Sequence, residues 1–205
     1  MKKVKYRITL TEEMLGCKPS SAQVFTDFIA VKKEDAKPSD EIDAAERAEK
    51  EIEQLEKGMT VFHRSDDGKK PIMWNYEWKG FLKDSIKSLR RDPESASAKV
   101  KAYKSVVDGC VFVEPRKIEM TIPDGGAIGI CERPLRAQTM QGERIALAKS
   151  ETVPAGTTME ITVLILSPDF EKVVDECMVY GSLHGIGQWR NSGKGTFTFE
   201  KLSAE

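Results

Sequence analysis

The chain has 205 residues, of which 32% are charged, and its formal net charge at pH 7 is -1. This length accommodates one large domain or two small ones. The balanced charge excludes a histone-like protein that binds nucleic acid through a large net positive charge. It is still compatible with a local basic face.

The four cysteines, Cys17, Cys110, Cys131 and Cys177, form no C-x-x-C pair, and the chain has only two histidines. This pattern argues against a zinc site and predicts reduced, mostly buried thiols. The N-terminal segment spaces its charges too closely for a signal peptide, and no run approaches the roughly 18 apolar residues of a membrane span. We therefore expect a cytoplasmic protein that has no cofactor or metal and does not contact a membrane.

Alternation of polar and apolar residues from Lys3 to Leu10 predicts a half-buried strand. Its polar face carries Lys3, Lys5 and Arg7, which would make one side of the strand strongly basic. Residues 20–31 follow with the apolar spacing of a short helix.

An acidic segment interrupts this pattern. Residues 33–57 contain ten acidic and five basic residues along a thin apolar stripe. This composition indicates an exposed helix, from Asp40 to Lys57, whose acidic face is solvated. A hairpin over 60–74, turning at Asp66-Asp67-Gly68, follows it. We treat residues 33–70 as an insertion into the fold.

A helix is predicted from about Glu77 to Arg91, because apolar residues recur at helical spacing. Lys79, Lys83 and Lys87 would occupy one side of it, and 96–101 would add a short helix. From Ser105 the sequence favours strands, over 110–113, 117–122, 128–132, 145–152 and 158–166. The last of these has apolar residues on both faces, which predicts a central strand buried on both sides.

Pro168 is placed to open a second long helix, with Ser167 as its N-cap and an end near Leu183. A final strand is predicted over 194–201. Without the acidic segment and the hairpins, the order is strand, helix, strand, strand, helix, strand. That order predicts an α+β, ferredoxin-like (RRM-like) βαββαβ domain spanning residues 1–205.

The segment between that helix and the last strand is rich in glycine, and we call residues 185–195 the glycine array. Its glycines stand in a G-x-G-x5-G-x-G pattern at Gly185, Gly187, Gly193 and Gly195. The spacing matches neither the Walker A motif nor the dinucleotide fingerprint. Such a loop can present backbone N–H groups to phosphates, while Trp189 and Arg190 can stack on bases. The alternative is a turn that only joins a helix to a strand.

The glycine array resembles that of the RAMP (repeat-associated mysterious protein) superfamily, whose members build and process CRISPR effector complexes. Gly185-Ile186-Gly187, Gly193 and Gly195 match the family's form, and Lys194 departs from it where an apolar residue is usual. Trp78-Lys79-Gly80-Phe81 is similar to the family's first helix. The resemblance implies RNA contacts at Lys79, Gly80 and the glycine array. It also likens residues 131–152 to a projecting thumb-like hairpin, here carrying Arg133, Arg136, Arg144 and Lys149.

The pattern is also similar to small proteins encoded by phages and prophages of Gram-positive bacteria. The shared stretches are the Lys-Gly-Phe helix start, Arg133-Pro-Leu-Arg136-Ala-Gln-Thr139 and Gly187-Gln-Trp-Arg-Asn191. This resemblance implies a fold and a phage setting.

Two classes of function remain open. The first is a non-enzymatic protein that binds single-stranded RNA or, less favoured, DNA, and that assembles with itself or with effector-complex subunits. Its candidate contacts are Lys79, Gly80, Lys83, Arg133, Arg136, Arg144, Gly185, Gly187, Trp189, Arg190, Asn191, Gly193, Lys194 and Gly195. The second is a phage-derived protein–protein interaction or assembly protein. A weaker third hypothesis is a metal-independent ribonuclease that uses His184 or His63, although both histidines also fit structural roles.

Overall fold

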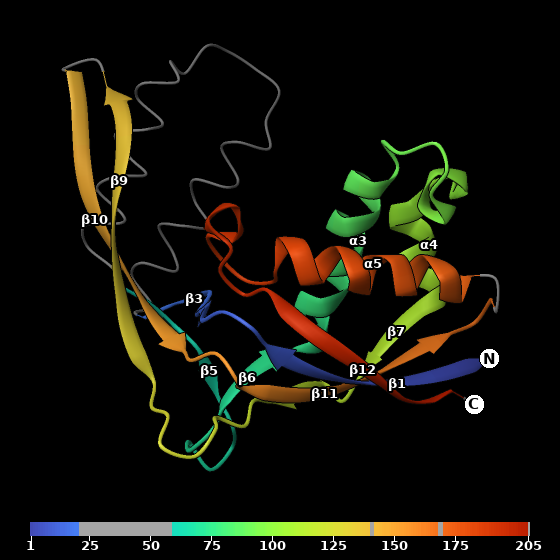
Figure 1. Ribbon diagram of the computed structural model, residues 1–205, viewed down its shortest axis with the longest axis horizontal. Helices are drawn as coiled ribbons and strands as arrows, with labels where there is room; N and C mark the ends of the chain where they lie inside the picture. Colours follow the sequence, from blue (N-terminus) through green and yellow to red (C-terminus); the bar gives the residue numbers. More distant parts are fainter. Residues whose placement is uncertain (21–58, 140–141, 168–169, 205) are drawn as a thin grey trace. The chain divides into compact units, whose positions relative to one another are not determined.

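The fold is shown by a computed structural model, which describes residues 1–20, 59–139, 142–167 and 170–204 (Figure 1). The chain forms two compact units. The first consists of Met1–Met14, His63–Ala127 and Val153–Glu205, and the second of Leu15–Phe62 and Ile128–Thr152. Strands and helices both contribute, so the α+β class predicted from the sequence is confirmed.

The main sheet of the first unit has four antiparallel strands in the order β12-β1-β11-β7. Their bounds are Lys2–Leu10 for β1, Val111–Glu114 for β7, Thr158–Ile165 for β11 and Phe197–Ala204 for β12. β1 pairs with β11 from Lys2↔Ile165 to Thr9↔Thr158, and its other edge pairs with β12. Strands from the two ends of the chain are therefore neighbours, and the strand predicted over 158–166 is central.

Two helices, α3 (Asn75–Leu89) and α5 (Glu171–His184), cover one face of this sheet (Figure 1). The ring of Phe197 on β12 meets those of Trp78 and Phe81 on α3, each at a centroid separation of 5.9 Å. Gly181 of α5 makes room for this cluster, because a Cβ there would lie 2.4 Å from the Phe197 ring. The apolar spacing of both helices thus predicts the face that they bury.

The other face of the sheet is open, which corrects one prediction. Residues alternate along β11 between buried and half-buried, so only one of its faces is buried. Ile161 and Val163 are 1% exposed, whereas Leu166 just beyond the strand is 48% exposed. An apolar residue on the open face of an antiparallel sheet does not require a covering layer.

Apart from the glycine array, the remainder of the first unit adds a small sheet and two short helices. Strands β5 (His63–Arg64), β6 (Pro71–Trp74) and β8 (Lys117–Glu119) pair in that order. The hairpin predicted over 60–74 is present from His63 to Trp74, with its turn at Asp66-Asp67-Gly68, whereas Met59–Val61 pairs with β3 and β10 in the second sheet. The 3-10 helix Ala96–Lys99 agrees with the prediction, whereas α4 (Tyr103–Cys110) was not predicted. Among the residues of α4, only Val107 is buried, so the helix lacks a recognisable apolar stripe.

The second sheet has the strand order β2-β10-β4-β3, with β9 paired to β10. The bounds are Met14–Leu15 for β2, Lys18–Pro19 for β3, Met59–Val61 for β4, Gly129–Thr139 for β9 and Gly142–Val153 for β10. β9 and β10 form one long antiparallel hairpin, in register from Gly129↔Thr152 to Thr139↔Gly142. The helices predicted over 20–31 and 40–57 lie outside the described residues.

Two further expectations are corrected. α5 begins at Glu171 with Phe170 as its N-cap, and Pro168 lies outside the described residues. Of the four cysteines only Cys177 is buried, and Cys17 is exposed, so the thiols are not mostly buried. Among the described residues, no helix is long and apolar enough to cross a membrane.

Candidate nucleic-acid interface

The glycine array follows α5, and its last residues cross over its first residues. The Gly185 N–H donates to the Gly181 carbonyl at 2.8 Å, and the Ile186 N–H donates to the Gly195 carbonyl at 2.9 Å. A Cβ at Gly195 would lie 1.9 Å from the Ile186 oxygen, and one at Gly185 would lie 2.4 Å from the Lys194 oxygen. Both positions therefore require glycine, since two backbone segments cross at this point.

Hydrogen bonds within the array and to Gly181 and Glu13 engage five of its backbone N–H groups. Besides the two bonds above, the N–H groups of Ser192 and Gly193 donate to Trp189 and Arg190, and that of Gly195 donates to Glu13 at 2.9 Å. Gly193 has a φ of +83° with open space around it, so its conformation rather than crowding favours glycine there. These bonds fit a self-closed loop. The bonds close the two ends of the array, and the exposed side chains of Trp189 and Asn191 lie between them.

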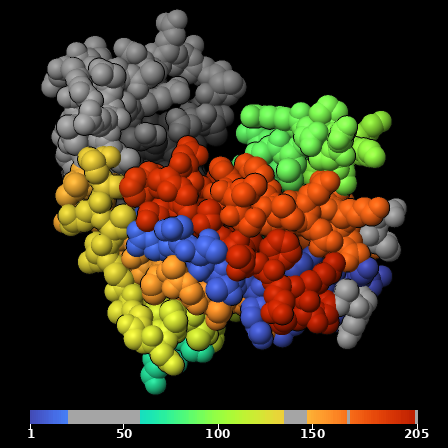
Figure 2. All heavy atoms as spheres, viewed as in Figure 1, coloured from blue at the N-terminus to red at the C-terminus, as the bar shows by residue number. Residues whose placement is uncertain are grey.

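Trp189 has a strained backbone conformation and a partly exposed side chain. Its φ of +55° lies in the left-handed region, and its side chain is 40% exposed. This conformation costs a non-glycine residue about 1–3 kcal/mol, and such strain concentrates at functional sites. The short 3-10 helix Arg190–Ser192 follows directly. The orange and red residues of the C-terminal part lie against the blue N-terminal strand at the surface (Figure 2).

Arg190 joins the array to α3. Its Nη1 donates to Oδ2 of Asp84 at 2.6 Å, and both side chains are about a third exposed, at 30% and 38%. Gly80 lies one helical turn before Asp84 and therefore on the same side of α3. A Cβ at Gly80 would meet nothing within 4 Å. The structure thus brings together two segments that the sequence singled out separately, and it leaves open space beside them.

Lys79 and Lys83 face a different neighbour. The Lys79 ammonium lies 5.0 Å from the centroid of the Phe112 ring and donates to the Asp108 carbonyl at 3.2 Å. Lys83 pairs with the Asp108 carboxylate at 2.6 Å, and this bond lowers the pKa of Asp108. The lysine side of α3 is therefore engaged by α4 and β7 and is not directed at the glycine array.

Two other residues of the array have distinct surroundings. Lys194 pairs with Glu13 at 2.7 Å, so the ammonium that departs from the family pattern neutralises a carboxylate of the N-terminal segment. Asn191 is exposed.

The arginines predicted on the 131–152 hairpin belong to the second unit. Arg133 is only 7% exposed, so a direct contact to a ligand would require its neighbours to move. Arg136 pairs with Ile145, and Arg144 with Ala137, in the β9–β10 ladder. The placement of the Arg136 and Arg144 side chains lies outside what the structure describes. Lys149 pairs with Glu132 at 2.7 Å.

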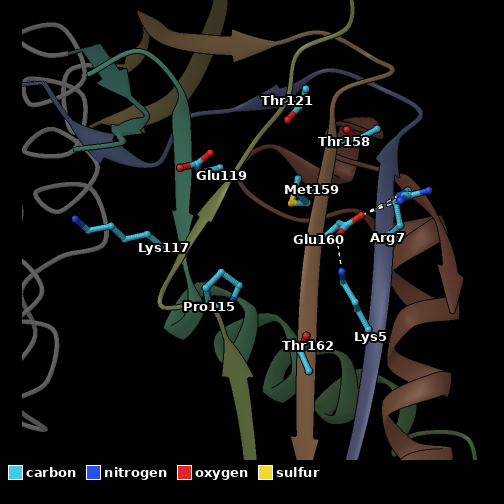
Figure 3. A pocket seen from close by; sticks show the side chains of 10 residues that line it. All are labelled: Lys5, Arg7, Pro115, Lys117, Glu119, Thr121, Thr158, Met159, Glu160 and Thr162. Atoms are coloured by element: carbon cyan, nitrogen blue, oxygen red, sulfur yellow. Dashed lines mark hydrogen bonds and ion pairs between the residues drawn. The ribbon is translucent and has the colours of Figure 1, made fainter. Parts of the chain in front are cut away.

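The basic face predicted for the first strand is largely neutralised. Glu160 on β11 lies 2.7 Å from Lys5 and 2.9 Å from Arg7. Both bonds lower the pKa of Glu160, that of Lys5 being the larger cause. Lys5, Arg7 and Glu160 line a shallow depression of about 550 Å³ on the open face of the sheet (Figure 3). Acidic and basic groups alternate there, so the depression has no strong preference for an anion.

The two histidines proposed as weak catalytic candidates lie on different elements. His184 is the last residue of α5, and its ring lies 5.0 Å from that of Tyr180. Burial lowers the pKa of His184, and the positive charge of Arg190 lowers it further while Asp84 opposes them. A neutral imidazole is thus favoured, rather than the charged form that a helix C-terminus would stabilise. His63 lies in β5, and its ring makes a T-shaped contact with that of Trp74 at a centroid separation of 5.6 Å.

Asp84 and Glu13 were missed as partners of the array, and Asp84 is the more informative omission. It stands among the lysines of α3, where an isolated carboxylate is a weak signal. Only the packing of α3 against α5 shows that it faces Arg190.

No family model and no curated protein matches the sequence. The structure is similar to a chain in the cryo-EM structure of the type III-B Cmr-beta bound to cognate target RNA, with a TM-score of 0.55 and 12% sequence identity. That match covers 100% of this chain and 60% of the other, so the protein is the shorter of the two. A chain of a type IV-B CRISPR complex has a TM-score of 0.48 and 11% identity, over 98% of this chain and 90% of that one. The first likeness shows a shared fold.

Proposed function

We propose that the protein is a non-enzymatic binder of single-stranded nucleic acid, with RNA preferred to DNA, built on a ferredoxin-like domain of the RAMP type. The strand order β12-β1-β11-β7, with α3 and α5 on one face, supports the ferredoxin-like assignment. The RNA preference is supported by the fold shared with a chain of an RNA-bound assembly.

The single observation that carries this proposal is the ion pair between Arg190 and Asp84. It holds the glycine array beside the first helix at 2.6 Å, next to the open space at Gly80. The two segments that resemble RNA-contacting motifs therefore form one surface. Trp189 would stack on a base there, because aromatic faces accept any base. Arg190 would donate to a phosphate through the guanidinium N–H groups that Asp84 does not use.

Within this surface we assign direct contacts to Gly80, Trp189, Arg190 and Asn191. Gly185, Gly187, Gly193 and Gly195 shape the loop that presents them. Lys79, Lys83 and Lys194 take part only if their carboxylate and carbonyl partners release them. Arg133 is left out because it is buried. Arg136 and Arg144 belong to the β9–β10 hairpin, which we propose as a thumb that contacts nucleic acid.

Fluorescence anisotropy tests the function directly. Labelled RNA and DNA 12-mers of mixed sequence are titrated with the protein at low and moderate salt. We expect binding that weakens steeply with salt, since neutralised phosphates release counterions, and tighter binding to RNA. Absence of binding at tens of micromolar protein, with a cooperative unfolding transition showing a folded sample, would contradict the proposal.

A second candidate is a phage-derived protein–protein interaction or assembly protein, and one observation favours it. Carboxylates already pair with Lys5, Arg7, Lys83, Lys149, Arg190 and Lys194. These pairs reduce the positive charge that phosphates would meet. A protein that binds neither RNA nor DNA but forms a discrete complex with a co-encoded protein would support this candidate over the first.

The ribonuclease hypothesis rests on His184 and His63. A neutral His184 suits a general base, but the described structure shows no second acid–base group hydrogen-bonded to it. We expect the wild-type protein to leave bound RNA intact over hours. Cleavage that disappears in the His184→Ala variant would reverse this assignment.

A further inference from the structure

The start of α3 carries an aromatic and cationic cluster that is separate in sequence from the glycine array. The rings of Trp74 and Tyr76 stack with a centroid separation of 6.2 Å and an interplanar angle of 12°. The ring of His63 on β5 makes a T-shaped contact with that of Trp74. Tyr76 is 59% exposed, so the stack ends at the protein surface. We call Trp74 and Tyr76 the aromatic platform.

Two cations flank this platform. The guanidinium of Arg116 lies 5.7 Å from the centroid of the Trp74 ring, and the ammonium of Lys117 lies 5.9 Å from it. Lys117 also pairs with Asp66. Within the part of the chain that the structure describes, no carboxylate pairs with Arg116, which is exposed. An anion close to Trp74 would therefore meet at least one uncompensated positive charge.

Backbone bonds fix the cluster in place. Trp74 and Lys117 are directly opposite in the β6–β8 ladder. The Asn75 N–H donates to the Arg116 carbonyl at 3.0 Å, and its side-chain amide donates to the Val113 carbonyl at 3.0 Å. The backbone next to the exposed Tyr76 is thus already ordered. A ligand that binds there would lose little free energy in fixing the tyrosine.

We propose that the aromatic platform binds an unpaired nucleobase on the outer face of Tyr76, with Arg116 and Lys117 neutralising the phosphates next to that base. An exposed aromatic face with flanking cations is the combination that single-stranded nucleic acid recognises. The inference rests on the proposed function and deepens it: the platform selects single strands over duplexes, whose stacked bases offer no free face.

The test compares two labelled RNA 12-mers, oligo-uridine and an oligomer of the same length whose sugars carry no bases. Tyr76→Leu removes the aromatic face, and Tyr76→Phe keeps it. We expect Tyr76→Leu to weaken binding of oligo-uridine by about five-fold or more, with Tyr76→Phe matching the wild type. Binding of the abasic oligomer should be equal for all three proteins.

Two charge variants complete the test. Arg116→Ala should weaken binding of both oligomers equally and reduce the salt slope by about one. Asp66→Asn, which releases Lys117, should tighten both. Thermal unfolding checks that each variant is folded. Because the Tyr76 side chain is exposed, we expect its substitution to leave the fold intact.

The outcomes separate the two proposals. If the wild type binds neither oligomer, the proposed function fails and the platform fails with it. If the wild type binds oligo-uridine and Tyr76→Leu binds it equally well, the platform is wrong and the proposed function stands. Equal losses for Tyr76→Leu on the uridine and abasic oligomers would also overturn the platform, because the effect would then not involve a base.

Discussion

Asp84 and Arg190 lie 106 positions apart in the sequence, and their side chains meet at 2.6 Å. This ion pair connects the first helix of the main fold with the glycine array that follows the second. Since both side chains are about a third exposed, we expect a coupling free energy of only about 0.5 kcal/mol. The ion pair matters because it places the glycine array beside α3, and it contributes little to the stability of the fold.

The first prediction concerns the role of Arg190. Asp84→Asn removes a negative charge and releases the guanidinium, so affinity for single-stranded RNA should rise by about two- to five-fold. Arg190→Ala should weaken binding instead. Anisotropy titrations of the two variants, beside Lys101→Ala as an exposed control, check this. Equal losses in both variants would show that the pair supports the fold and does not bind the ligand.

The second prediction contrasts two helical glycines. Gly80→Ala meets open space, so the better helix propensity of alanine should stabilise the protein by about 0.5–1 kcal/mol. Gly181→Ala would place a methyl group 2.4 Å from the Phe197 ring, and overpacking should destabilise the protein by about 1–3 kcal/mol. Urea unfolding measures both changes. If Gly80→Ala raises stability yet lowers RNA affinity, the open space is used by the ligand.

The third prediction uses the glycines of the array. In Gly193→Ala the alanine must adopt the left-handed conformation of the glycine, so the unfolding free energy should fall by about 1 kcal/mol. Gly195→Ala adds a clash with the Ile186 oxygen and should cost more, with partial loss of the ordered loop. Denaturant unfolding ranks the two. Equal, negligible costs would contradict the crossing of backbone segments described above.

The fourth prediction concerns pH. Because the folded pKa of His184 is lowered, the unfolded chain binds its proton more readily, and stability should fall as the pH drops below about 6.5. His184→Gln cannot titrate, so its unfolding midpoint should change less than that of the wild type between pH 7.5 and 5.5. Parallel midpoints for the two proteins would show that the pKa of His184 is not lowered.

The sequence predicts the parts of this fold that have a clear period. Alternation in Lys2–Leu10 and apolar spacing in Asn75–Leu89 and Glu171–His184 give the strand and both helices that carry the site. α4 has a single buried residue, Val107, and so gives no such signal. Periodicity identifies which residues are buried, but it does not identify which segments meet.

The candidate site shows the same limit. Trp189 and Arg190 can be singled out from the glycine pattern, but their placement beside Asp84 depends on how α3 packs against α5. Clusters of like charge are a weaker guide. In the sequence, Lys5 and Arg7 indicate a basic face. The pairing of β1 with β11 places Glu160, more than 150 positions away, beside both of them. Long-range pairing decides whether a basic cluster is available to a ligand.

The most direct test of the central claim is the affinity of the double variant Trp189→Ala, Arg190→Ala for single-stranded RNA, measured by anisotropy beside the wild type and Lys101→Ala. Loss of one stacking face and one phosphate contact should weaken binding by about tenfold or more, while the unfolding midpoint stays within a few degrees of the wild type. Unchanged affinity in a folded double variant would contradict the claim that the glycine array is the nucleic-acid interface.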